Sequence, residues 1–240
     1  MSAPKLAQGP QAVPSAPSPQ PPQPAQGPDV SAPLRLGVLI SGGGTNLQAI
    51  IDRIAAGTLN AQVAIVISSR PGAAGLRRAE AAGIQTMSLS KELYEDPLVA
   101  DEAIATALLR AKVDYVIMAG YMRMVRYPIL RTFKNRVINL HPALLPSFKG
   151  AHAIQDAYDY GVKVTGVTVH VADERYDCGP IIAQRPLEVE ESWTVDELER
   201  HVHDLEHELL PDVIQLLAEG RVSVSADGKV CVRQDERPNA

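Results

Sequence analysis

The sequence predicts an α/β fold, a doubly wound and mostly parallel sheet with helices on both faces and antiparallel strands added in the C-terminal half. From residue 34 to about residue 141, short apolar runs alternate with segments whose apolar residues recur at helical spacing. Strands that are apolar without alternation are typical of a parallel sheet covered on both faces. The run 164–171 alternates in side-chain character instead, and we expect it to be an antiparallel addition. Ligands of such folds bind at the carboxyl ends of the strands.

The periodicity of the apolar residues predicts the elements in order. In the first half, we expect strands at 36–40, 62–68, 84–89, 113–118 and from 136, with helices at 46–56, 73–82, 97–112 and 127–133. In the second half, we expect a helix at 153–160, strands at 164–171 and 180–184, a long helix at about 194–218 and a hairpin at 221–232. Gly57, Gly83 and Gly161 stand where helices should end, and Ala226-Asp227-Gly228 is a hairpin turn signal.

Composition divides the chain into three parts. Residues 1–33 hold ten of the 19 prolines, interleaved with Gln, Ala, Ser and Gly, and almost no large apolar side chain. Such a segment cannot bury enough surface to offset its ordering entropy, so we expect a disordered tail. We expect one folded domain over 34–220 and a C-terminal hairpin and tail over 221–240.

Charge and composition also restrict the class of protein. A net charge of −5, with one Trp and two Phe, does not provide the basic surface with interleaved aromatic residues that binds nucleic acid. No apolar run approaches the roughly 18 residues of a membrane span, and the N-terminus lacks the apolar core of a signal peptide. Two isolated cysteines indicate a reducing compartment. We therefore expect a cytoplasmic protein with small-molecule substrates and no nucleic-acid or membrane partner.

The stretch N-L-H-P-A-L-L-P at 139–146 is the first candidate site. Side chains at i and i+2 of a strand point to the same side, so Asn139 and His141 can reach into one cleft. The amide can stabilise an oxyanion, and the imidazole can move a proton near neutral pH. The pair therefore suits an acyl-transfer site. The alternative is a strand-end asparagine that caps a turn beside a histidine in a loop.

A second candidate is the segment S-G-G-G-T-N at 41–46, called the Gly loop below, between the first strand and the first helix. Backbone N–H groups and the helix dipole can hold an anion there. No Gly-Lys-Ser/Thr of a Walker A loop follows, and Leu47 occupies the place of the third glycine of a dinucleotide fingerprint. We therefore expect a small phosphate monoester. The alternative is a tight turn with Thr45 or Asn46 as the helix N-cap.

Taken together, four segments resemble the folate-dependent phosphoribosylglycinamide formyltransferase family. They are S-G-G-G-T-N-L at 41–47, A-G-Y-M-R-M-V at 119–125, N-L-H-P-A-L-L-P at 139–146 and D-E-R-Y-D-C-G-P at 173–180. The resemblance covers about 34–220. It implies an enzyme of de novo purine biosynthesis that transfers a formyl group from 10-formyltetrahydrofolate, the co-substrate, to the amine of glycinamide ribonucleotide, without a metal. The resemblance is compatible with a homodimer.

The resemblance also implies roles for single residues. Its catalytic residues fall on Asn139, His141 and Asp177. Its ribonucleotide contacts fall on Gly44, Thr45, Asn46 and Glu206, and its folate contacts on Met122, Arg123, Met124, Val125, Asn139, Asp173 and Asp177. Asp177, if near, would favour the protonated form of His141. The chain departs from the family at Ala143, often a serine, at Lys149, usually a proline, and at Pro97, often an arginine that contacts substrate.

Other functions are open as alternatives. The segment H-D-L-E-H at 203–207 matches the H-x-x-E-H zinc signature of inverted metallopeptidases. Methionyl-tRNA formyltransferase would need a further basic C-terminal domain, and formyltetrahydrofolate deformylase would need a folded regulatory domain before residue 34. A non-catalytic folate- or nucleotide-binding module would bind both ligands without turnover. Cys178, beside Asp177, is a candidate nucleophile, with an inert turn residue as its alternative.

Overall fold

The structure is a computed structural model in which residues 32–234 are described. Its main sheet has the strands β1 (Leu34–Ile40), β2 (Ala61–Ser68), β3 (Thr86–Ser88), β4 (Tyr115–Met118), β5 (Val137–His141), β6 (Val164–Val171) and β7 (Ile181–Glu188). The helices are α1 (Thr45–Ala55), α2 (Ala74–Ala81), α3 (Lys91–Glu95), α4 (Pro97–Arg110), α5 (Tyr127–Thr132), α6 (Ala153–Tyr160) and α7 (Val195–Ala218). Nearly all of the tail predicted at 1–33 lies outside the described residues, as do residues 235–240.

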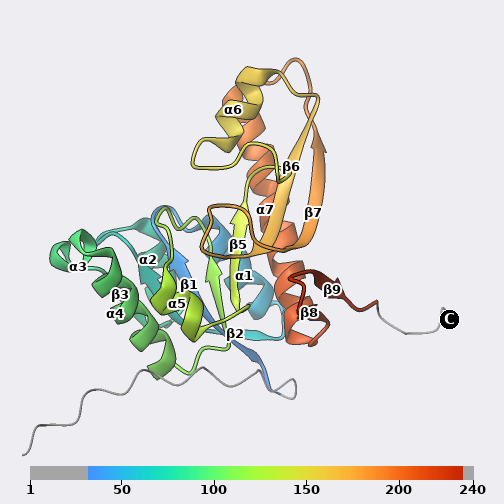
Figure 1. Ribbon diagram of the computed structural model, residues 1–240. Helices are drawn as coiled ribbons and strands as arrows, with labels where there is room; N and C mark the ends of the chain where they lie inside the picture. Colours follow the sequence, from blue (N-terminus) through green and yellow to red (C-terminus); the bar gives the residue numbers. More distant parts are fainter. Residues whose placement is uncertain (1–31, 235–240) are drawn as a thin grey trace, which may run out of the picture.

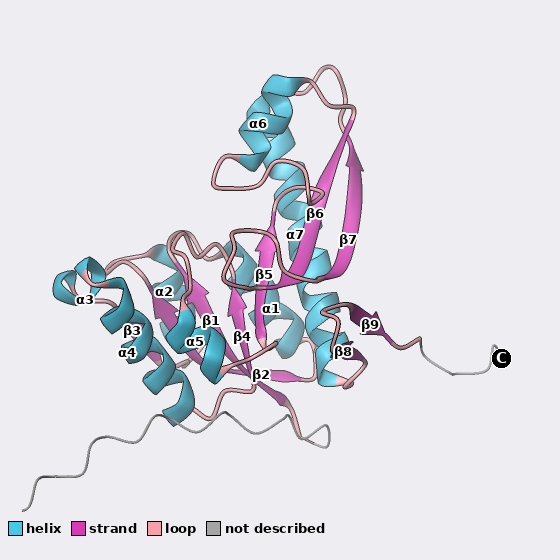
Figure 2. Cartoon of the chain, in the orientation of Figure 1, coloured by secondary structure: helices cyan, strands magenta, loops and turns pink. Residues whose placement is uncertain are grey.

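The predicted fold class is confirmed by the strand order, which is β3-β2-β1-β4-β5-β6-β7 (Figure 1). β1 to β5 pair in parallel, and β6 and β7 are antiparallel additions at one edge. Helices lie on both faces of this sheet (Figure 2). α1 and α7 share one hydrophobic core with side chains such as Val38, and α4 and α5 share a second core with side chains such as Leu39. Neighbouring residues of β1 are therefore both buried, which explains its apolar run without alternation.

Two elements differ from the prediction. Helix α3 was not expected; it is a short turn capped by Ser90, whose Oγ accepts the N–H of Leu93 at 3.3 Å. Strand β7 continues to Glu188, past the predicted end at 184. It can include Pro186 because it is an edge strand of the sheet, where a missing backbone N–H costs no pairing on the open side. Pairing with β6, rather than local composition, sets its length.

The predicted C-terminal hairpin is present as β8 (Val222–Val224) and β9 (Val230–Val232). Its valines pack against the core that α1 and α7 share. The division into parts at 33/34 and 220/221 stays a prediction. Within residues 32–234, no helix is both long enough and apolar enough to cross a membrane.

Candidate active site

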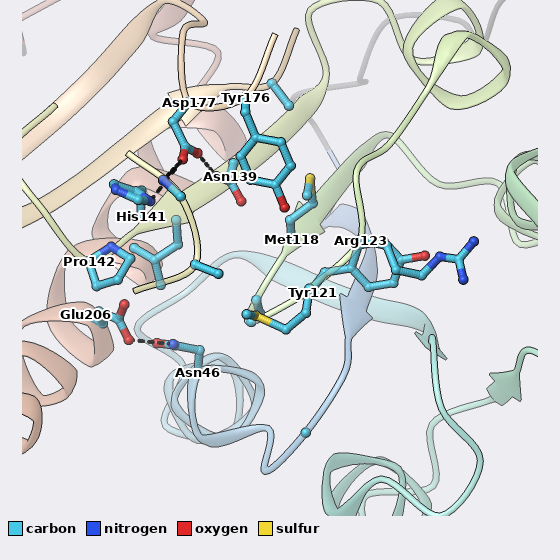
Figure 3. Close-up of a pocket in the computed structure, with 18 of the residues that line it drawn as sticks. Asn46, Met118, Tyr121, Arg123, Asn139, His141, Pro142, Tyr176, Asp177 and Glu206 are labelled. Atoms are coloured by element: carbon cyan, nitrogen blue, oxygen red, sulfur yellow. Dashed lines mark hydrogen bonds and ion pairs between the residues drawn. The ribbon is translucent and has the colours of Figure 1, made fainter. Parts of the chain in front are cut away.

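A cleft of about 490 Å³ lies at the carboxyl ends of β1, β4 and β5 (Figure 3). The strand order reverses between β1 and β4, because the chain first moves outward to β2 and β3 and then returns to the other side of β1. Doubly wound folds bind ligands in the crevice at this switch point. The residues to which the family resemblance assigns roles all line this cleft: Gly44, Thr45, Asn46, Met122, Arg123, Met124, Val125, Asn139, His141, Asp173, Asp177 and Glu206.

Asn139 and His141 both reach the cleft from β5, as the strand period predicts. His141 is buried, with an exposed fraction of 4%. Its Nε2–H donates to the carbonyl oxygen of Phe148 at 2.8 Å, and its Nδ1 lies 3.5 Å from Oδ2 of Asp177 (Figure 3). The loop after β5 therefore holds the ring with one nitrogen toward the carboxylate.

Asp177 lies in the turn between β6 and β7 with a left-handed backbone, φ +49°. Its Oδ2 accepts the N–H of Gly150 at 2.9 Å, and its Oδ1 accepts Nδ2–H of Asn139 at 3.4 Å. Burial raises the pKa of this carboxyl, but the contacts with His170 and Gly150 and the nearby His141 outweigh burial, so its pKa is lowered. The carboxylate is therefore ionised at neutral pH, and its negative charge faces the rings of His141 and His170.

His170 is a further residue of this cluster that the sequence analysis did not identify. The register of β5 and β6 places it opposite Asn139, with Nε2 3.1 Å from Nδ2 of Asn139 and 3.7 Å from Oδ1 of Asp177. Its Nδ1–H donates to the carbonyl oxygen of Val171 at 3.0 Å, so the neutral ring offers Nε2 as an acceptor to the amide. The alternation of 164–171 predicts that His170 lies on one face of a strand. No local pattern predicts the register of this strand against β5.

The Gly loop connects β1 to α1 without a side-chain cap. Gly44 is the N-cap, with φ +71°, and a Cβ there would lie 2.6 Å from Cα of Gly75, so only glycine fits. Nε–H of Arg78 donates to the carbonyl oxygen of Gly43 at 2.9 Å and holds the loop from outside the cleft. The first N–H groups of α1 are left without a side-chain acceptor, which suits a bound anion.

Asn46 links the Gly loop to α7. Its Nδ2–H donates to Oε2 of Glu206 at 2.9 Å (Figure 3), so the alternative of a side-chain N-cap from Thr45 or Asn46 is wrong. Glu206 is buried, with an exposed fraction of 4%, and the same oxygen accepts Nδ1–H of His203 at 2.9 Å. Nε2 of His203 lies 3.4 Å from Oε1 of Glu199. The hydrogen bond with Glu206 raises the pKa of His203, burial opposes it, and Glu199 adds to the increase.

The 122–125 loop after β4 forms another wall of the cleft. The N–H of Met122 donates to Oγ of Ser41 at 2.9 Å. Just beyond the loop, the N–H of Arg126 donates to Oδ2 of the buried Asp101 at 2.6 Å. These two hydrogen bonds hold the ends of the loop against β1 and α4.

The structure also shows the surroundings of the two alternative sites from the sequence analysis, the H-x-x-E-H segment and Cys178. In the H-x-x-E-H segment, the rings of His203 and His207 are stacked 6.4 Å apart, and His203 is hydrogen-bonded to Glu206. In the described part of the chain, no group of three or more His, Cys, Asp or Glu side chains is arranged to hold a metal ion. Sγ of Cys178 accepts a hydrogen bond from Nζ of Lys149 at 2.9 Å.

Besides Lys149, the chain departs from the family pattern at Ala143 and Pro97. Ala143 is fully buried, where a serine hydroxyl would need a partner. Pro97 is the first residue of α4, a position that tolerates its missing N–H. Its ring offers no positive charge to a ligand.

The chain belongs to the formyl transferase family, whose sequence pattern matches residues 34–214. Phosphoribosylglycinamide formyltransferase of Bacillus subtilis is 38% identical over 76% of this chain and 94% of its own length. The crystal structure of glycinamide ribonucleotide transformylase 1 from Symbiobacterium toebii is 44% identical, covers 84% of this chain and 94% of its own, and has a TM-score of 0.80. Trifunctional purine biosynthetic protein adenosine-3 of Homo sapiens is 42% identical over 84% of this chain, which spans 20% of that protein. These comparisons confirm the predicted resemblance and the prediction of an enzyme of this family.

Proposed function

We propose that this protein transfers the formyl group of 10-formyltetrahydrofolate to the amine of glycinamide ribonucleotide, in purine biosynthesis. The names of the relatives supply the acceptor, and the resemblance to folate-dependent enzymes supplies the donor. The observation that carries the proposal is that Asp177 contacts both Asn139 and His141 inside the cleft. The Gly loop and the 122–125 loop line the same cleft, so both substrates can reach this cluster.

The reaction requires an oxyanion contact and the movement of one proton. The amine attacks the formyl carbon, which gives an oxyanion and an ammonium; the bond to N10 breaks when N10 gains a proton, and the ammonium loses one. Asn139 hydrogen-bonds the oxyanion, giving up the longer of its contacts, the 3.4 Å one with Asp177. Protonated His141 stabilises the same charge and donates the proton. Groups of these two kinds each contribute roughly two to four orders of magnitude in rate.

The two ends of the cleft suit the two substrates. The backbone N–H groups of Gly44, Thr45 and Asn46 suit a phosphate monoester, and the carboxylate of Glu206 suits ribose hydroxyls. The folate meets the 122–125 loop and the turn between β6 and β7, through Met122, Arg123, Met124, Val125, Asp173 and Asp177. Composition supports the remaining parts of the proposal, which are a cytoplasmic location and small-molecule substrates without a nucleic-acid or membrane partner.

A turnover assay with both substrates tests the proposal. The full chain should form tetrahydrofolate from 10-formyltetrahydrofolate only when glycinamide ribonucleotide is present, with one formylated ribonucleotide for each tetrahydrofolate. Formate release without the ribonucleotide would indicate a deformylase instead. Binding of both ligands without turnover would indicate a binding module. His201→Gln is a matched control, because His201 stacks on Trp193 and does not line the cleft.

A further inference from the structure

A lysine and a cysteine are in contact just outside the cleft. Lys149 lies in the loop between β5 and α6, and Cys178 lies in the turn between β6 and β7. Nζ of Lys149 donates a hydrogen bond to Sγ of Cys178 at 2.9 Å. Neither residue lines the cleft, although their neighbours Gly150 and Asp177 do. Lys149 is exposed and Cys178 is half-buried, so a small molecule in solution can reach the pair.

The backbone on both sides of this contact is held in place. The N–H of Gly150, which follows Lys149, donates to Oδ2 of Asp177, which precedes Cys178, at 2.9 Å. On the other side of Cys178, Gly179 packs so closely on the backbone of β6 that an added Cβ would overlap a carbonyl oxygen. The amine and the sulfur are therefore brought together by the contacts of their neighbours. Two groups held in this way react as an intramolecular pair, without the entropy cost of meeting in solution.

We propose that Lys149 and Cys178 form a peroxide-responsive crosslinking site, in which oxidation of the sulfur joins Sγ to Nζ by a covalent bond. Hydrogen peroxide first transfers one oxygen atom to the thiol, which becomes a sulfenic acid; the O–O bond breaks and the other oxygen leaves as water. The amine of Lys149, after losing its extra proton to solvent, then attacks the sulfur. The S–O bond breaks, the S–N bond forms, and the hydroxyl leaves as water with one proton of the amine. Overall, the sulfur loses two electrons and the peroxide gains them.

Cys231 provides an internal comparison for this reaction. Its side chain is exposed on β9, so peroxide can reach it as well. Lys229, two residues before it, pairs with Asp227 at 3.3 Å. Within residues 32–234, no amine is hydrogen-bonded to the sulfur of Cys231. We therefore expect Cys231 to be oxidised by peroxide without forming a bond to a lysine.

The crosslink would act on the backbone groups that hold His141 and Asp177. The carbonyl oxygen of Phe148 accepts from His141, and the N–H of Gly150 donates to Asp177, and these two residues flank Lys149. A covalent S–N bond is shorter than the present contact of 2.9 Å, so its formation draws the loop and the turn toward each other. Because a displacement of about 1 Å in an active site can cost about a hundredfold in rate, we expect crosslinking to lower kcat at least about tenfold. This effect on kcat rests on the proposed function, whereas formation of the crosslink does not.

Mass spectrometry of the full chain after treatment with hydrogen peroxide tests the crosslink. Tryptic digestion should yield two peptides joined between Lys149 and Cys178. The joined pair should be about 2 Da lighter than the sum of its parts, because one oxygen atom is gained and one water molecule is lost. Dithiothreitol should separate the two peptides, since its two thiols are oxidised to a disulfide while the sulfur and the amine regain their hydrogens.

Three variants separate the crosslink from general oxidation. Lys149→Arg keeps a positive charge and a hydrogen-bond donor, but a guanidinium group stays protonated and does not attack the sulfur. Cys178→Ser keeps a hydrogen-bond acceptor and cannot form a sulfenic acid. Neither variant should give joined peptides, and both should keep the turnover of untreated wild type. Cys231→Ser should crosslink as wild type does.

Turnover measured after removal of the peroxide gives the second readout. Wild type and Cys231→Ser should lose turnover in proportion to the joined fraction and regain it with dithiothreitol, whereas Cys178→Ser should keep its turnover. Sulfinic acid at Cys178 without joined peptides, or a disulfide between two chains through Cys178, would overturn the proposal. Crosslinked protein with full turnover would overturn the effect on catalysis. If the peptides are joined but untreated protein forms no formylated ribonucleotide, the crosslinking site stands and the proposed function fails.

Discussion

Replacing Asp177 by asparagine should lower turnover about a hundredfold while leaving the fold intact. The backbone there has φ +49°, a left-handed conformation that asparagine tolerates as well as aspartate. The amide oxygen of the new side chain can still accept the N–H of Gly150, now bonded at 2.9 Å. The substitution therefore removes the charge and keeps the shape of the turn.

The magnitude follows from the contacts that lose their charge. Asp177 faces Nδ1 of His141 at 3.5 Å through one oxygen, and through the other it faces Asn139 at 3.4 Å and His170 at 3.7 Å. A hydrogen bond to a charged group contributes about 1.5–3 kcal/mol. The 3.7 Å contact with His170 is too long for a hydrogen bond, so losing the contacts with His141 and Asn139 at the lower value costs about 3 kcal/mol, and about 1.4 kcal/mol corresponds to tenfold in rate. The expected loss in kcat is therefore about a hundredfold, with a much smaller change in KM.

The variant should also change the pH dependence of stability. The folded-state pKa of Asp177 lies below its ordinary value of 3.8, so its contribution to stability is present above that value and is lost as pH falls through the lowered pKa. Asp177→Asn should remove this acid-side dependence in thermal melts.

Steady-state kinetics with both substrates, over a range of pH, measure these effects. Glu174→Gln is the matched control, because it removes a charge from an exposed side chain of the same turn. Its kcat and pH profile should match wild type. If Asp177→Asn keeps most of its turnover, the charge of Asp177 does not support the reaction.

Three further changes test the Gly loop, the cap of α7 and the support of the 122–125 loop. Gly43→Val, at a position where an added Cβ meets no atom within 4 Å, should raise KM for the ribonucleotide far more than for the folate; equal increases would contradict a phosphate site at the Gly loop. Thr194→Ala removes the capping box that Thr194 forms with Glu197 and should lower the free energy of unfolding by about 1 kcal/mol in a urea titration, and an unchanged midpoint would show that the cap does not limit stability. Asp101→Asn keeps an acceptor for the N–H of Arg126 and removes a carboxylate whose pKa burial raises. The variant should be at least as stable as wild type at about pH 8 and should lack the gain in stability that wild type shows as pH falls toward 3.8; thermal melts that rank it below wild type at the higher pH would refute this.

The elements and part of the site were predictable because their signals are local. Buried parallel strands are apolar on both faces wherever they lie in the sheet, and helices end at residues such as Gly161, with φ +75°, whatever packs around them. Asn139 and His141 share one side of β5 because the side-chain period of a strand is two residues. The Gly loop was recognisable because its glycines stand between a strand and a helix, and Gly44 has room for no other residue.

Only the tertiary structure decided which distant groups meet. Asp177 lies 38 residues from Asn139, and Glu206 lies 160 residues from Asn46, yet each pair is hydrogen-bonded. His170 joins the cluster of Asn139 and Asp177 through the register of β5 and β6, and β7 takes its length from pairing with β6. These contacts depend on strand register and on the packing of α7 against α1. Burial of the whole core sets both, so no local pattern of residues can specify them.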